Sequence, residues 1–81
     1  MTIRVQFWSY FKELTGCAHL TEELPEGSTV DELLKRLHAR HPKLAAFQNS
    51  TLIAVGLDYQ GRSHVLRAGD EVSLFPPVQG G

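Results

Sequence analysis

The C-terminal residues are the part of this chain whose types and spacing could support chemistry. Residues 70–75 alternate as a half-buried strand does, Pro76 and Pro77 follow, and the chain continues through Val78 and Gln79 to Gly80 and Gly81. Proline has no N–H and holds φ near −65°, so the two prolines end strand pairing and favour an extended geometry. The segment 76–81 would then reach roughly 18 Å at ~3.1 Å per residue. A terminal Gly-Gly has no side chains, so it can enter a narrow channel and approach a reactive centre closely.

The reactive group that this segment offers is the carboxylate of Gly81. A carboxylate is a poor electrophile, so a partner must activate it. Adenylation by an ATP-using enzyme would create an anhydride with a good leaving group, which a sulfur or an amine nucleophile could attack. Glycines at a chain end can also be plain disorder, but here they follow a strand and two prolines without a low-complexity linker.

Other residues with chemical potential carry weaker signals. Cys17 is the single cysteine, so a disulfide within the chain is impossible, and we expect a structural, buried thiol. His38 and His41 could chelate a metal from one helix, but further ligands at suitable spacing are missing, so contact with the helix C-terminus explains them better. His19 and His64 are isolated and expected to be exposed. The body is therefore expected to have no active site, no metal and no stably bound cofactor.

The amino-acid composition limits the class of protein to which this chain can belong. The chain has 81 residues, is 42% hydrophobic and has a formal net charge of −1, which fits one folded domain. It has no basic run, so nucleic-acid binding is not expected. It lacks the ~20-residue apolar run that a membrane span needs, and a single cysteine fits a reducing compartment. A cytoplasmic location is the expectation.

The residue pattern of the first 24 residues predicts a strand, a short helix and a second strand. Residues 2–8 alternate between an apolar face and a polar face, with Trp8 on the outer side. Ser9 is placed to cap a helix that extends to residue 15, and Gly16 to end it in the left-handed conformation. Residues 17–24 alternate again, with Ala18 on the same face as two leucines, so an antiparallel pair is expected.

The residue pattern at the centre of the chain predicts the longest helix. Thr29 and Glu32 match a capping box, and apolar residues then recur at helical spacing: Val30, Leu33, Leu34 and Leu37. Pro42 ends this helix, and residues 42–48 could add one further turn. Residues 51–57 predict a strand covered on much of both faces, residues 58–61 a turn, residues 61–66 a weak strand or irregular edge, and residues 67–70 a turn.

These elements predict an α+β fold, a β-grasp or ubiquitin-like roll, in which one long helix packs on one face of a mixed sheet. The globular domain would span residues 1–75, and residues 76–81 would project as a tail. The last strand would pair with the first, so Trp8 and Phe75 would both face solvent on the side opposite the helix, with Tyr59 at the rim. Such a cluster suits partner docking, although it could instead be further core beneath the short helix.

Several segments resemble one known family. The run GDEV (69–72) followed by FPPVQGG (75–81) is similar to the C-terminus of the molybdopterin synthase small subunits, a branch of the ubiquitin-like sulfur carriers. The likeness extends to VQFW (5–8), to FKELTG (11–16) and to the capped helix at Thr29. Where the family often has Asn, this chain has Gly56.

The resemblance implies a function that composition cannot show. An adenylyltransferase similar to ubiquitin-activating enzymes would use ATP to charge Gly81, sulfur transfer would give a C-terminal thiocarboxylate, and the large synthase subunit would use that sulfur for the molybdopterin dithiolene. The active complex in this family is a heterotetramer of two small and two large subunits. The tail inserted in the large subunit would be Pro76, Pro77, Val78, Gln79, Gly80 and Gly81, and the docking residues Trp8, Tyr59 and Phe75. A carrier for another thiolation pathway (thiamine, cysteine or tRNA) and a ubiquitin-like protein modifier remain as alternatives.

Overall fold

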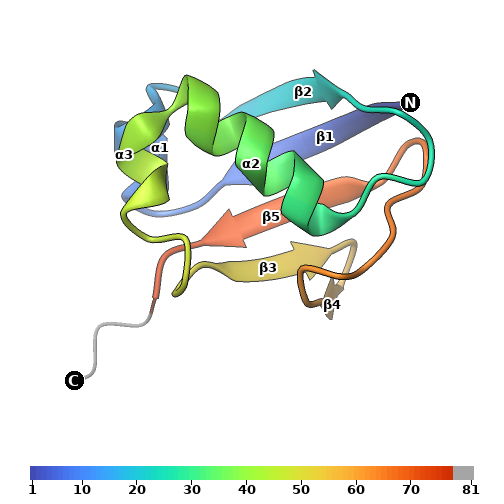
Figure 1. Cartoon of the computed structure of the whole chain (residues 1–81). Helices are drawn as coiled ribbons and strands as arrows, with labels where there is room; N and C mark the ends of the chain where they lie inside the picture. Colours follow the sequence, from blue (N-terminus) through green and yellow to red (C-terminus); the bar gives the residue numbers. More distant parts are fainter. Residues whose placement is uncertain (78–81) are drawn as a thin grey trace.

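A five-stranded mixed sheet carries the fold in the computed structural model, which describes residues 1–77 (Figure 1). The sheet order is β2-β1-β5-β3-β4; β1 and β5 are parallel, and the other neighbouring pairs are antiparallel. The helices lie on one face, with α2 crossing the sheet and α1 and α3 at one end (Figure 1). This is the predicted β-grasp arrangement. The elements are β1 (Thr2–Phe7), α1 (Phe11–Thr15), β2 (His19–Glu23), α2 (Val30–Arg40), α3 (Pro42–Ala45), β3 (Leu52–Val55), β4 (Asp58–Tyr59) and β5 (Glu71–Phe75).

The core lies between α2 and the inner face of the sheet. The predicted apolar stripe of α2 is buried, as are the inward side chains of the two central strands, β1 and β5. Because successive strand residues point to opposite faces, the same two strands present their alternate side chains on the helix-free outer face. Within residues 1–77, no helix is long and apolar enough to cross a bilayer.

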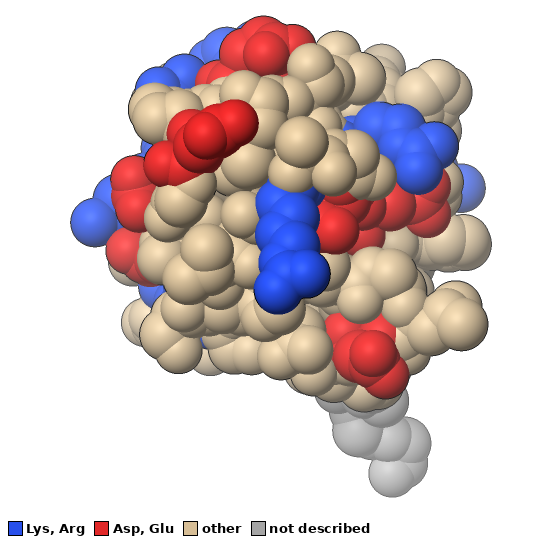
Figure 2. Space-filling view, turned by 90° about the vertical axis from the view of Figure 1, so that its right-hand side faces the viewer, with Lys and Arg blue, Asp and Glu red and all other residues tan. Residues whose placement is uncertain are grey.

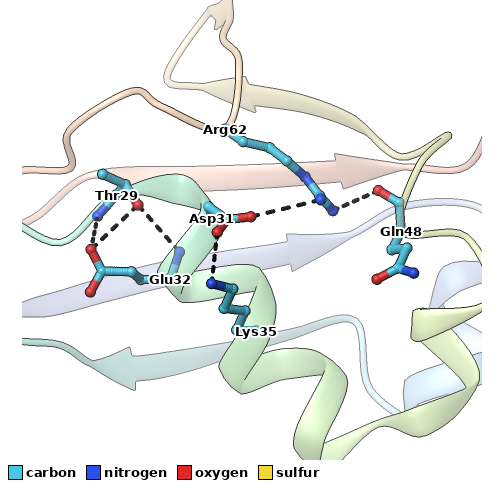
Figure 3. A network of polar contacts seen from close by, with 6 residues as sticks. All are labelled: Thr29, Asp31, Glu32, Lys35, Gln48 and Arg62. Atoms are coloured by element: carbon cyan, nitrogen blue, oxygen red, sulfur yellow. Dashed lines mark hydrogen bonds and ion pairs between the residues drawn. The ribbon is translucent and has the colours of Figure 1, made fainter.

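The predicted capping box starts α2. The Thr29 hydroxyl accepts from the Glu32 N–H at 3.3 Å, and the Glu32 carboxylate accepts from the Thr29 N–H at 3.3 Å (Figure 3). Arg62 belongs to the loop after β4 and contacts the start of α2. Its guanidinium lies 3.7 Å from the Asp31 carboxylate and also donates to the Gln48 carbonyl at 2.6 Å (Figure 3). The irregular segment 60–66 is thus held against α2 by polar contacts. It forms no strand, only an isolated bridge between Val65 and Thr29.

The junction between β1 and α1 differs from the sequence-based expectation. Ser9 does not cap the helix, because its backbone is left-handed with φ 54° and the N-cap position belongs to Tyr10. The Ser9 carbonyl instead accepts from the Lys12 N–H at 3.1 Å. Gly16 ends the helix with φ 77°, as predicted. A left-handed non-glycine residue costs roughly 1 kcal/mol or more, so the sharp turn after Trp8 is maintained against local strain.

The β3–β4 hairpin also differs from the prediction. The strand predicted for 51–57 is shorter, and its two-residue turn is Gly56-Leu57, with Gly56 at φ 61°. The turn expected at 58–61 is wrong, because Asp58 and Tyr59 pair with β3 as the short strand β4. Leu57, predicted within a covered strand, is fully exposed.

A buried carboxylate lies on the inner face of β2. Glu22 alternates in register with Leu20 and Leu24 and is only 7% exposed, whereas Ala18, predicted on that face, is exposed. The Glu22 carboxylate forms an ion pair with Arg40 from the last turn of α2. This contact joins the edge strand β2 to the last turn of α2, with the Arg40 side chain 55% exposed.

Replacing Arg40 should therefore destabilise the fold. Arg40→Met leaves the buried Glu22 carboxylate without its counter-charge, and we expect a loss of about 1–3 kcal/mol in the free energy of unfolding, measured by urea titration. Arg36→Met is the matched control, because the Arg36 guanidinium donates to a backbone carbonyl, that of Glu23, at 3.0 Å. An equal or larger loss for the control would contradict the importance of the buried pair.

Candidate functional site

Three aromatic side chains come together on the outer face of the sheet, and we call them the aromatic platform: Trp8, Phe75 and Tyr59. The Trp8 and Phe75 rings stack with centroids 5.6 Å apart and planes 14° apart. The Tyr59 ring lies 6.5 Å from Phe75 at 59°. Trp8 is 43% and Tyr59 72% exposed. The expectation that these residues are neighbours on the solvent side is confirmed; their role in docking stays a prediction.

Strand register places the platform. The Trp8 N–H donates to the Leu74 carbonyl at 3.1 Å, which brings Trp8 beside the end of β5. Across β5, Phe75 is opposite Leu52 of β3, whose outward side chain is 39% exposed. Tyr59 then follows through the pairing of β4 with β3. Residues far apart in sequence therefore form one apolar surface.

A groove of ≈ 460 Å³ runs alongside the platform at the end of β5. Its walls come from the β1–α1 junction, the β3–β4 hairpin and the start of the C-terminal segment: Ser9, Tyr10, Leu52, Tyr59, Phe75, Pro76 and Pro77. The two prolines are half-buried there. The C-terminal segment thus begins at a groove lined by Tyr10, Tyr59 and Phe75, of which Tyr59 is exposed. The Tyr10 hydroxyl is buried without a hydrogen-bond partner among the described residues.

The remaining residues of the predicted tail, Val78, Gln79, Gly80 and Gly81, lie outside the described residues. The predicted reactive carboxylate and the predicted boundary at residue 76 therefore stay expectations from sequence.

The other candidate residues are dispersed. Cys17 is half-buried, packs against the core and lies 3.7 Å from the Thr15 hydroxyl. His41 meets Phe7 edge-on, with centroids 6.2 Å apart. His19 is exposed as expected, but His64 is half-buried because its segment lies against α2. Among residues 1–77, no three potential ligands gather around a metal position.

His38 is more buried than its place late in α2 suggested. Burial lowers its pKa from the ordinary value of 6.5, the Arg62 charge lowers the pKa further, and the Asp31 carboxylate opposes both effects. His38 does lie in the last turn of α2, and the interpretation that the helix C-terminus stabilises it stays a prediction.

Sequence reasoning missed two contributors to the outer face. Leu52 was treated as part of a covered strand, although its alternation with Ile53 separates an outward from an inward side chain. Leu57 was missed because the turn was placed two residues too late. A glycine directly before it was the available signal, since glycine favours the positive φ of two-residue hairpin turns.

The sheet order, the crossing helix and a C-terminal segment leaving the central strand define a ubiquitin-like β-grasp protein. Residues 5–81 match the model of the ThiS family, and the chain belongs to that family.

Curated relatives match almost the whole chain. It is 36% identical to the molybdopterin synthase sulfur carrier subunit of Escherichia coli, over 98% of this chain and 99% of that one. It is 32% identical to the protein of that name from Arabidopsis thaliana, covering 98% and 82%. It is also 30% identical to small archaeal modifier protein 3 of Haloferax volcanii, covering 100% of both.

Among solved structures, the putative molybdopterin converting factor subunit 1 of Pyrococcus furiosus superimposes with a TM-score of 0.87 at 30% identity, over 96% of this chain and 99% of that one. The fold and the family are therefore established over the length that contains the platform.

The lowered pKa of His38 predicts a pH effect on stability. The unfolded chain binds this proton near pH 6.5 and the folded chain only at lower pH, so the His38 contribution is complete above 6.5 and is lost as the pH falls below it. In His38→Gln, the free energy of unfolding should fall less between pH 7.5 and pH 5.5 than in the wild type, as measured by urea titration. Equal pH dependence in both proteins would contradict this assignment.

Proposed function

We propose that this chain is the sulfur-carrier subunit of a molybdopterin synthase and that Gly81 is the residue that carries the sulfur. The observation that carries the proposal is the near full-length match to relatives of that name, together with a family match that reaches residue 81. The sequence Pro-Pro-Val-Gln-Gly-Gly supplies the chemical rationale.

The chemistry would proceed in two substitutions at the terminal carboxyl group. A carboxylate oxygen of Gly81 attacks the α-phosphate of ATP on an adenylyltransferase, and pyrophosphate leaves. A sulfur nucleophile then attacks the acyl carbon, AMP leaves, and a thiocarboxylate remains. In the large subunit the sulfur would be donated toward the dithiolene of molybdopterin, with Gln79 and Gly80 lining the inserted tail. Such a chain is a carrier without an active site of its own.

The aromatic platform would dock the large subunit. Large rigid rings that are partly exposed supply much of the affinity at protein interfaces, because they bury wide areas with little loss of conformational freedom. The platform lies directly at Pro76 and Pro77, where the C-terminal segment begins. Docking there would aim the tail at one point on the partner, and a complex of two small and two large subunits is the proposed assembly.

A second candidate is a protein modifier whose Gly81 forms isopeptide bonds to lysines. The similarity to the modifier protein of Haloferax volcanii favours it. Both functions begin with the same activated carboxylate and differ in the nucleophile, so the product distinguishes them. A sulfur carrier for the thiamine, cysteine or tRNA pathway would differ only in the acceptor enzyme.

Intact-mass spectrometry tests the proposed chemistry. After incubation with ATP, the cognate adenylyltransferase and a sulfide source, the chain should gain the mass difference between one sulfur and one oxygen atom. A variant lacking Gly81 should gain nothing and keep its melting temperature, since a terminal glycine has no side chain to bury. High-mass lysine conjugates in place of the sulfur adduct would favour the modifier.

Binding to the large synthase subunit tests the platform. Trp8→Ala and Tyr59→Ala should each weaken binding by roughly 1–4 kcal/mol, as measured by calorimetry, because both rings would be buried in the complex. Val65→Ala is a control, since Val65 is also an exposed large apolar residue but lies in the loop beside α2. Unchanged affinity in both aromatic variants would discard the docking role.

A further inference from the structure

Leu57 is the most exposed large apolar side chain among the described residues, and nothing in the fold requires it there. It occupies the second position of the two-residue turn between β3 and β4, where a polar residue would satisfy the backbone equally well. A fully exposed leucine contributes little to the stability of the isolated chain. Its presence points to a contact made with another molecule.

The hairpin holds Leu57 in a fixed position. The Gly56 N–H donates to the Glu71 carbonyl at 2.9 Å, and the Gln60 N–H donates to the Ile53 carbonyl at 3.0 Å. Val55 pairs with Asp58 across the turn. These bonds anchor both sides of the tip, so an interaction through Leu57 would lose little conformational entropy.

The tip is continuous with the outer face that carries the platform. Leu57 lines a hollow of ≈ 410 Å³ together with Arg4 and Glu71, whose positions in β1 and β5 face outward. It precedes Tyr59 by two residues, which is roughly 7 Å along a strand. An interface of about 800 Å² on each partner has a radius of roughly 16 Å, so one partner can cover both residues.

The charges around the hairpin tip limit which partner surface can pair with it. Asp58 is exposed but pairs with Val55, so it lies on the face opposite Tyr59. Asp70 and Glu71 line the hollow together with one cation, Arg4. The Arg4 guanidinium is 3.9 Å from the Glu71 carboxylate, a weak and solvent-exposed pair. Figure 2 shows the end of the molecule that carries the hairpin tip: acidic and basic side chains are interspersed with uncharged surface and form no continuous field of one sign. Selectivity must therefore come from local pairing around Leu57.

We propose that Leu57 is a second docking anchor for the partner that binds the aromatic platform, inserting into an apolar pocket whose rim carries lysine or arginine side chains opposite Glu71. This inference rests on the proposed function, because it assigns Leu57 to the interface of the large synthase subunit. It extends that interface from the end of β5 to the far end of the β3–β4 hairpin.

Calorimetric binding to the purified large synthase subunit of the same source organism tests the anchor. Leu57→Ser should weaken binding about tenfold, whereas the matched variant Val65→Ser should leave it within about twofold. Both side chains are exposed, so both variants should keep the wild-type melting temperature. Glu71→Gln should also weaken binding, because it would remove the negative charge that the basic rim faces.

The outcomes separate this inference from the proposed function. If Trp8→Ala weakens binding and Leu57→Ser does not, the anchor is overturned while platform docking stands. Unchanged or tighter binding by Glu71→Gln would overturn the basic rim. If the wild type itself shows no binding, the proposed function fails, and the anchor fails with it.

Discussion

The parallel pairing of β1 with β5 is the constraint on which the rest of the structure depends. These strands come from opposite ends of the described chain and lie at the centre of the sheet, with Val5 opposite Val72 and Phe7 opposite Leu74. Their inward side chains form the floor of the core beneath α2. On the outward side, Phe75 ends β5 and Trp8 directly follows β1, where its N–H donates to the Leu74 carbonyl. One register therefore fixes both the stability of the domain and the position of the surface at which the C-terminal segment begins.

A buried carboxylate makes a second contribution to the stability of the fold, and the hydrophobic pattern of the sequence does not reveal it. Glu22 occupies an inward position that alternation would assign to an apolar residue, and Arg40 from α2 supplies its counter-charge. At the start of the helix, Asp31 meets both Lys35 of the same helix at 3.2 Å and Arg62 of the loop after β4 (Figure 3). The pairs with Glu22 and Arg62 thus link the two ends of α2 to neighbouring segments, and the apolar stripe of the helix is buried. The helices lie on one face of the sheet, which leaves the outer face uncovered by helices (Figure 1).

Much of the fold could be predicted because local signals agreed with the tertiary structure. The Thr29 capping box, the α2 stripe and the alternation in β1 each depend on neighbours a few residues apart. The failures have non-local causes. Ser9 adopts a left-handed backbone because the chain must turn after pairing with β5, and the turn at Gly56 is fixed by a hydrogen bond to Glu71. The platform was predictable from the expected strand order. The exposure of Leu52 and Leu57 could be predicted only with the register of the β3–β4 hairpin.

The strand order also determines when, during synthesis, the chain can fold and bind a partner. β5 is translated last among the strands but supplies a central one, so an incomplete chain would have β1 and β3 with no strand between them. Contacts of such long sequence separation form late and cooperatively. A ribosome-bound or prematurely terminated chain would have neither a complete sheet nor the stacked aromatic pair. The topology thereby couples the integrity of the body to the presentation of the residues that follow it, so truncated products would not compete for partners.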